Sequence, residues 1–455
     1  MIKGPSPFLN LSLFHCIAFD TGNDLIENAA LAQSLFYNLT MSPPSQSTPG
    51  SRRLFAAVSA LRHRNYRLYW FGQLFSVLAQ NMEAVAQSWL VLEITNSPLL
   101  LGLTGLTFSV PTIALTLLGG VVADRTDRKR IMILSQIGSV VMFLVLAVLV
   151  ITERVALWQV MTAAFFSGSF RAFDRPSRMA LLPQMVPKQD IPNAVAIGGT
   201  IWQLNKLVGP ALAGVLIYLI GIGPTYLFCC AASATAILLW IGIRLESQRN
   251  TASAGGLLQN MLEGLNFIRK NEIYYTFIGM TFFNSVFGMS YLILMPVFAR
   301  DILSVGSEGF GFLQSAGGAG ALCGVLLVAY FGQARGKGKQ AISGALVFGA
   351  LLIVFAYSTS YALSLVMACL LGMSSQFYMT TIHTILQVNL PDELRGRVMG
   401  IHGLAWELMP VGGMIGGLIA EVSGAPSAVA FGGAMVAGMA LLVAIFLPSI
   451  RRLEQ

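Results

Sequence analysis

Twelve long apolar stretches occupy most of the chain, and each is long enough to cross a lipid bilayer. A spanning helix needs about 20 predominantly apolar residues. Because the bilayer core offers no water to backbone polar groups, only helices and closed barrels cross it. Runs of this length and continuity predict an all-α membrane protein with twelve transmembrane helices. The predicted spans are 68–92, 99–122, 131–151, 156–176, 195–220, 224–243, 273–298, 308–331, 341–358, 362–385, 398–420 and 426–448.

The positive charges lie almost entirely on one side of these spans. If the N-terminus is inside, the outer connections hold Arg154 and Arg300, whereas most of the 28 Lys and Arg residues fall inside. This assignment places Arg171, Arg175 and Arg178 in an inner loop. The positive-inside rule then predicts cytoplasmic termini and a location in the cell (inner) membrane. The net charge of +8 therefore reflects topology, and no nucleic acid partner is expected.

Residues 244–272 interrupt the series of spans. The stretch "ESQRNTASAGG" is typical of a linker, and "LLQNMLEGLNFIRK" predicts an amphipathic helix on the inner membrane surface. Residues 1–50 fit a disordered extension better than a signal peptide, with Met41 as the expected true start. The predicted domains are this extension, a six-helix half at 51–243, the cytoplasmic linker at 244–272, a six-helix half at 273–448 and a cytoplasmic tail at 449–455.

The two predicted halves resemble each other in sequence. One ungapped alignment pairs Trp202 with Trp406 and Gln203 with Glu407, together with several glycines. The chain holds only six tryptophans, so the tryptophan match is informative. Such a repeat predicts a pseudo-two-fold axis along the membrane normal and a substrate path between the halves. A repeat kept only for packing is the alternative, but repeated bundles of this size favour transport.

The loop between spans two and three, "GGVVADRTDRKR", resembles the signature loop of the major facilitator superfamily. The chain has Asp127 where that family usually has glycine. The resemblance implies that Asp124 lies against the positive N-terminal end of span eleven and closes an inner gate. A cluster that only fixes topology is the alternative. The predicted gating residues are Gly120, Asp124, Arg125, Arg128, Lys129 and Arg130.

Three further stretches narrow the resemblance. "AFDRPSRMALLPQMVP" (172–187), "LRHRNYRLYWFGQLFS" (61–76) and "LVLEITNSPLLLGL" (90–103) are similar to the drug and siderophore exporters, the enterobactin-exporter and macrolide-efflux branch. Span five partly matches the glycine–proline motif of the exporters, with Thr200 at the first glycine position. An antiporter-type helix competes here with ordinary tight packing, because small residues and proline serve both. The matching residues are Gly209, Pro210, Ala213 and Gly214.

Polar residues recur inside the predicted spans. Span one carries a stripe of them, from Gln73 to Gln87, on one helical face that must contact protein or water. The family resemblance implies that spans one, five, seven and eleven line a central cavity. The predicted lining residues are Gln73, Gln80, Gln87, Gln203, Asn205, Asn284, Trp202 and Trp406.

Two acidic residues within the spans are predicted proton carriers. These are Glu83 in span one and Glu407 in span eleven, with Lys206 as the neighbouring cation. Burial and a nearby cation shift the pKa of a carboxyl group in opposite directions, which allows a proton to load and leave. A static Glu–Lys pair that locks helices is the alternative. His383 and His402 are weaker candidates for the same role.

The sequence lacks the marks of an enzyme or an ATP-driven pump. The stretch "GQARGKGK" is too short for a phosphate loop and lacks its Ser or Thr. We therefore expect a proton-coupled exporter of small amphipathic compounds, drugs or siderophores, that works by alternating access as a monomer in the lipid bilayer. No cofactor, metal or enzymatic activity is expected. An importer or uniporter of the same fold, and a transporter-like sensor or scaffold, are the alternatives.

Overall fold

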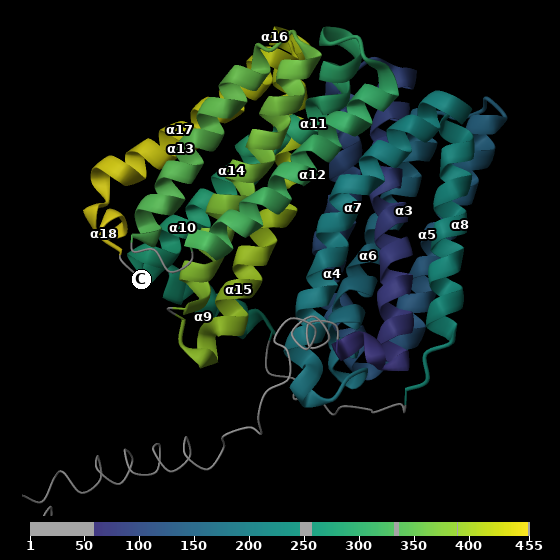
Figure 1. The fold of residues 1–455 in the computed structure, drawn as a ribbon, viewed down its shortest axis with the longest axis horizontal. Coiled ribbons are helices and arrows are strands. Elements are labelled where there is room, and N and C mark those ends of the chain that lie inside the picture. The colour runs from purple at the N-terminus through teal and green to yellow at the C-terminus, as the bar shows by residue number, and fades with distance from the viewer. Residues whose placement is uncertain (1–58, 246–256, 332–335, 389, 454–455) are drawn as a thin grey trace, which may run out of the picture. The chain divides into compact units, whose positions relative to one another are not determined.

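The computed structural model describes residues 59–245, 257–331, 336–388 and 390–453. These residues are helical almost throughout, and no strand occurs among them, which confirms the predicted all-α membrane fold (Figure 1). The N-terminal extension at 1–50 and part of the linker lie outside the described residues, so both stay predictions.

The first group of helices corresponds to predicted spans one to six. Ser97 caps the start of α4, where its side chain accepts a hydrogen bond from Leu100 N, and Pro98 occupies the first turn, where no N–H is needed. The helices are α3 (Arg64–Thr95), α4 (Pro98–Arg125), α5 (Arg128–Ile151), α6 (Leu157–Leu181), α7 (Ile191–Ile220) and α8 (Ile222–Ile241).

The second group of helices corresponds to spans seven to twelve and follows the linker helix α9 (Leu257–Lys270). Spans seven and eleven, predicted as continuous, are interrupted. A π-helical turn at Asn284–Gly288 separates α10 from α11, and Leu408, just before Pro410, separates α15 from α16. Proline cannot donate a helical hydrogen bond, which accounts for the second break. The helices are α10 (Glu272–Phe283), α11 (Ser290–Val297), α12 (Gly306–Phe331), α13 (Lys337–Ala356), α14 (Tyr361–Val388), α15 (Asp392–Glu407), α16 (Met409–Ser423), α17 (Ala425–Phe446) and α18 (Pro448–Arg451).

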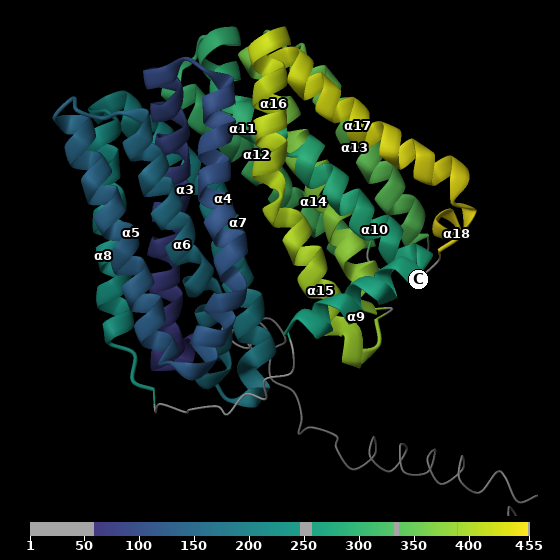
Figure 2. The same ribbon diagram turned by 180° about the vertical axis from the view of Figure 1, so that it is seen from behind.

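The packing within the first group recurs in the second. In the first, α4 and α5 both pack on α6, and α8 packs on α3 and α5; in the second, α12 and α13 both pack on α14, and α17 packs on α11 and α13. Between the groups, α7 packs on α12 and α16 packs on α4 (Figure 2). Each contact has a counterpart when spans are exchanged with their repeat equivalents. This supports the predicted repeat, while the domain boundaries themselves stay predictions.

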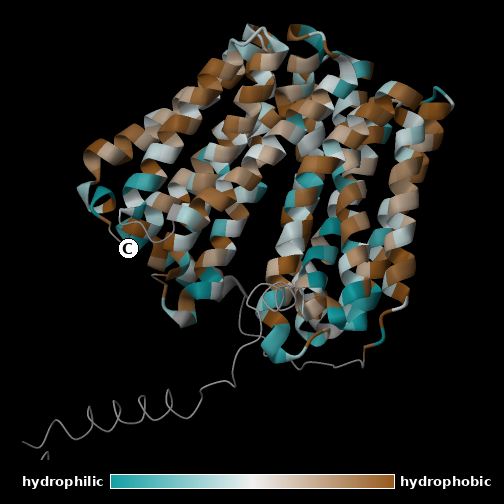
Figure 3. Cartoon of the chain, in the orientation of Figure 1, coloured by the Kyte–Doolittle hydropathy of each residue, from teal (hydrophilic) through white to brown (hydrophobic). Residues whose placement is uncertain are grey.

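Hydrophobic residues run along most of the helices, and hydrophilic residues gather near one end of the first group (Figure 3). Within the described residues, ten helical stretches are long and apolar enough to cross a membrane. Helices α3 and α6 are not among the ten, since their polar and charged side chains lower their hydropathy. The count of twelve spans therefore stays a prediction, and the two exceptions are the helices that build the site described next.

Candidate functional site

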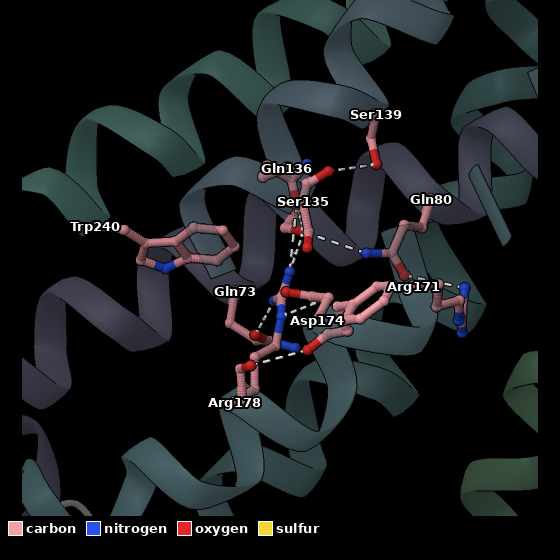
Figure 4. A network of polar contacts seen from close by, with 12 residues as sticks. Gln73, Gln80, Ser135, Gln136, Ser139, Arg171, Asp174, Arg178 and Trp240 are labelled. Atoms are coloured by element: carbon pink, nitrogen blue, oxygen red, sulfur yellow. Dashed lines mark hydrogen bonds and ion pairs between the residues drawn. The ribbon is translucent and has the colours of Figure 1, made fainter. Parts of the chain in front are cut away.

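A buried arginine ties α6 to α3. Arg178 is 6% exposed, forms an ion pair with Asp174 at 2.6 Å from Nε to Oδ2, and donates hydrogen bonds to Gln73 and, at 3.0 Å, to Ser76 Oγ (Figure 4). A buried charge is tolerated only when it is paired and hydrogen-bonded. These contacts pair the guanidinium of Arg178 with a carboxylate and join α6 to α3, the two helices that are absent from the ten apolar spans.

The same guanidinium reaches α5 and α8. Arg178 Nη2 lies 3.3 Å from Gln136 Oε1, which also accepts a hydrogen bond from Ser76 Oγ at 2.8 Å. The guanidinium carbon lies 4.5 Å from the ring centroid of Trp240, whose Nε1 donates to Tyr69 O at 3.3 Å. This polar network therefore links α3, α5, α6 and α8.

The position of this arginine corrects the sequence analysis. The charge count assigned Arg171, Arg175 and Arg178 to an inner loop, although the span predicted at 156–176 already includes the first two. Helix α6 continues to Leu181, so all three lie within a helix. Their spacing, together with Asp174, is that of one helical face. That periodicity could have identified them, because charges repeating every three or four residues next to an apolar run indicate a polar face in a buried helix.

A small pocket opens beside this network, between α3, α4, α5 and α6. Glu83, Gln80, Arg171 and Asp174 line it, along with Ser139. Asp174 Oδ1 is buried without a hydrogen-bond partner in the described structure. Such a carboxylate oxygen beside a polar pocket is suited to accept a hydrogen bond from a water molecule.

Glu83 lines this pocket as a buried carboxyl group, 8% exposed. Among the described residues it has no hydrogen bond or ion pair, although Arg171 lines the same pocket and donates from Nη1 to Gln80 Oε1 at 3.2 Å. The lysine predicted as a partner, Lys206, is exposed on α7 and has no ion pair within the described part of the chain. A locked Glu83–Lys206 pair is therefore not formed in this structure.

The other predicted proton carrier connects the two groups. Glu407, at the end of α15, forms an ion pair with Arg175 of α6, at 2.6 Å from Nη1 to Oε1. The side chains of Arg175 and Glu407 are 65% and 29% exposed. The repeat-related tryptophans are both partly exposed, and Arg171 lies 6.0 Å from the ring centroid of Trp202 and 5.8 Å from that of Phe108.

Four predicted lining residues do not join this cluster through any contact in the described structure. Gln87 Nε2 and Gln203 Oε1 are buried without hydrogen-bond partners. Asn205 bonds to its own helix at Ile201 O, at 2.9 Å. Asn284 accepts a hydrogen bond from Tyr378 inside the second group. Conversely, α6 was not among the four spans expected to line a cavity, yet it supplies the charges of the site.

In the predicted gating loop, the side chains that the structure describes contact helices of the first group. Lys129 Nζ donates to Ile241 O and Ile243 O at 2.9 and 2.7 Å. Arg128 Nη1 donates to Ala180 O at 3.2 Å. Arg130 Nε lies 3.4 Å from Asp127 Oδ2, and Gly120 borders open space. The side chains of Asp124 and Arg125 lie outside the described residues, so the predicted gate contact stays a prediction.

Asp127, which stands where the resembling family has glycine, begins α5. Its Oδ1 accepts hydrogen bonds from Lys129 N at 3.0 Å and Arg130 N at 3.4 Å. Aspartate is among the preferred residues at this position, since its carboxylate satisfies N–H groups that have no partner within the helix. The departure from glycine therefore has a structural role in this chain.

The glycine–proline motif of α7 lies at the crossing with α12. Gly209, Pro210, Ala213 and Gly214 are all buried, and a Cβ on Gly214 would lie 2.5 Å from Ser307 O of α12. Pro210 has no N–H for the carbonyl of Lys206 one turn earlier. A Cβ on Gly318 of α12 would lie 2.5 Å from that same carbonyl oxygen, so the freed carbonyl faces the backbone of the other group.

Comparison with known proteins places these features in a family. The family described as "Transmembrane secretion effector" matches residues 55–455. Multidrug efflux pump Tap of Mycolicibacterium fortuitum is 25% identical over 403 residues, covering 85% of this chain and 96% of Tap. Macrolide efflux protein A of Streptococcus pyogenes is 22% identical (87% and 98% covered), and enterobactin exporter EntS of Shigella boydii is 23% identical (86% and 94% covered).

Solved structures show the same fold at low sequence identity. A bacterial homologue of the human lysosomal transporter Spinster has a TM-score of 0.63 at 14% identity, covering 89% of this chain and 97% of that one. A POT family transporter in complex with 5-aminolevulinic acid has a TM-score of 0.68 at 11% identity, with 85% and 96% covered. The chain is therefore a multi-pass membrane transporter of small molecules rather than an enzyme, and it belongs to the transmembrane secretion effector family, in the drug and siderophore exporter branch of the major facilitator superfamily.

Proposed function

We propose that this protein exports small amphipathic compounds, drugs or siderophores, in exchange for protons. The relatives named as efflux pumps and as an enterobactin exporter support the substrate class and the direction. The observation that carries the proton coupling is Glu83, a buried carboxyl group without an ion-pair partner among the described residues, beside a polar pocket in a membrane helix.

The chemistry of Glu83 fits a proton carrier. Ionised carboxylates are costly inside a membrane unless a cation or a hydrated cavity stabilises them. The guanidinium of Arg171 supplies the cation, and the polar pocket supplies room for water. These stabilise the ionised form of Glu83, whereas burial in the helix bundle stabilises its protonated form. Glu407, already paired with Arg175, is less suited to carry the proton in this conformation.

The same arrangement supports the proposal of alternating access. The two helix groups meet through symmetry-related crossings, α7 on α12 and α16 on α4. A substrate bound between the groups, or a proton bound at Glu83 within the first group, would bias one crossing arrangement over another. We further propose a monomer in the cell inner membrane with both termini in the cytoplasm, because the basic residues gather at one side.

The test uses inverted membrane vesicles with an acidified interior. A panel of macrolides, catechol siderophores and lipophilic cations is added, and the interior pH is followed. An exported compound should collapse the gradient with the native protein and not with Glu83→Gln. The matched control is Glu93→Gln, the same change at an exposed position on the same helix, which should behave as the native protein. Uptake of a labelled compound without any pH change would instead identify a uniporter.

A further inference from the structure

The junction between α3 and α4 is bound from both sides by charged residues of the second group. Arg300, in the π-helical turn Phe298–Ile302, donates from Nη1 to Leu92 O at 2.9 Å and to Asn96 Oδ1 at 2.8 Å. Glu421, near the end of α16, accepts hydrogen bonds from Ser97 Oγ at 2.9 Å and Leu99 N at 3.4 Å. Asn96 and Ser97 are consecutive, so the two charges enclose one short connection.

Each charge sits at the helix end that favours it. The last turn of α3 has no basic residue and the first turn of α4 has no acidic residue. Unpaired carbonyls and N–H groups leave partial negative charge at a helix C-terminus and partial positive charge at an N-terminus. Arg300 therefore completes the C-terminus of α3, and Glu421 completes the N-terminus of α4. Asn96 N and Ser97 Oγ already cap these two ends from within the first group, and the second group adds the two charged partners.

Nearby contacts show that this is a built interface. Asp301 holds the Arg300 guanidinium through two contacts, at 2.6 and 3.1 Å. Gly417 lies one turn before Glu421 on α16, and a Cβ there would come within 2.5 Å of Pro98 O, so the α16 backbone reaches the start of α4. Trp89 of α3 stacks on Phe310 of α12, with ring centroids 6.0 Å apart.

We propose that Arg300 and Glu421 are positioning residues of the outer gate, which hold the outer ends of the two groups together by capping α3 and α4. An exporter must separate these ends to release its substrate, and separation breaks both charged contacts at once. Charge-assisted hydrogen bonds are stronger than neutral ones. Their loss therefore contributes to the free energy of opening the outer side, which substrate or proton binding has to offset. The inference rests on the orientation in the proposed function, but not on proton coupling.

The test measures opening directly. Ser307, 6% exposed between α12 and α7, donates to Gly214 O at 3.3 Å. A Ser307→Cys reporter is made with the native cysteines replaced, and its reaction rate with a membrane-impermeant thiol reagent is measured from the outside. Arg300→Gln combined with Glu421→Gln should raise the rate about tenfold, the effect of roughly one charge-assisted hydrogen bond. Arg300→Lys should keep most of the protection.

The matched controls are Arg154→Gln and Glu153→Gln, which remove the same charges from an exposed outer connection of the first group. They should leave the reporter unchanged. The proposal is overturned if the double variant labels at the native rate, or if the controls accelerate labelling equally. Met179→Cys at an exposed position, made in each variant without Ser307→Cys, reports that the protein is folded and inserted. The labelling assay uses no proton gradient and no substrate. Its result therefore stays interpretable even if the proton-coupling test fails.

Discussion

Arg175 and Glu407 join the two helix groups through an ion pair between residues 232 positions apart in sequence. Glu407 follows Trp406, and its repeat equivalent is the uncharged Gln203, which follows Trp202. The ion pair therefore has no symmetric copy among the described ion pairs. The pair therefore distinguishes the two groups at a place where the sequence repeat makes them alike.

Removing either partner should weaken the link between groups by a modest amount. Exposed ion pairs contribute about 0.2–1 kcal/mol, so a double-mutant cycle of Arg175→Gln and Glu407→Gln on thermal unfolding should give coupling of that size. The charge reversal Arg175→Glu with Glu407→Arg should restore transport lost in either single reversal. A double reversal that loses as much transport as the two single reversals combined would show that the two residues act separately.

Arg178 should matter more for stability than for substrate choice. Its replacement by Met leaves Asp174 buried and unpaired, and breaking a buried pair costs about 3–5 kcal/mol. Thermal unfolding of purified Arg178→Met should reveal this loss. Adding Asp174→Leu should recover part of it, because the stranded charge is then removed. A single variant as stable as the native protein would contradict the role assigned to this network.

Asp127→Ala should destabilise the protein by about 0.5–2 kcal/mol, because the N-terminal N–H groups of α5 lose their acceptor. Asp127→Gly, which restores the residue usual in the resembling family, should cost only a few tenths of a kcal/mol. Thermal unfolding of both variants measures the difference. The assignment of Asp127 as a cap fails if glycine is the more damaging of the two.

Gly318→Ala should disturb the crossing of α7 and α12, since its Cβ would lie 2.5 Å from a backbone oxygen. Overpacking of this kind costs about 1–3 kcal/mol, so the Ser307→Cys reporter should label about fivefold faster or more. Gly438→Ala on α17 is the matched control, because a Cβ there meets nothing within 4 Å. Native labelling by Gly318→Ala would mean that the crossing adapts without separating.

The fold and the family could be predicted from the sequence. The long apolar runs, the basic residues on one side of the spans and the loop motif between spans two and three are all visible in short stretches of the chain. The breaks at Asn284 and Leu408 did not follow, since apolar periodicity continues across both. The charges of α6 were missed for a related reason. Arg171, Arg175 and Arg178 met the expectation for a topogenic loop, and only the helix that continues to Leu181 shows that they face α3 and α15.

The candidate site was less predictable than the fold. Glu83 was predicted from its place on a polar face of α3, and it lines one pocket with Gln80, but its partners depend on which helices pack beside it. The pairing of Glu407 with Arg175 rather than Lys206 is a tertiary outcome. Likewise, Arg300 and Glu421 cap helices of the other group, and no local pattern reveals a cap supplied from more than 200 residues away.

The most direct test of proton-coupled export separates exchange from net transport. Purified protein and its Glu83→Gln variant are reconstituted into liposomes loaded with a compound that passed the vesicle screen, and labelled compound is followed with and without a proton gradient. A neutral residue at 83 cannot return with a proton, so Glu83→Gln should keep compound-for-compound exchange and lose gradient-driven accumulation. If Glu83→Gln accumulates the compound as fast as the native protein, Glu83 does not carry the proton and the central claim is wrong.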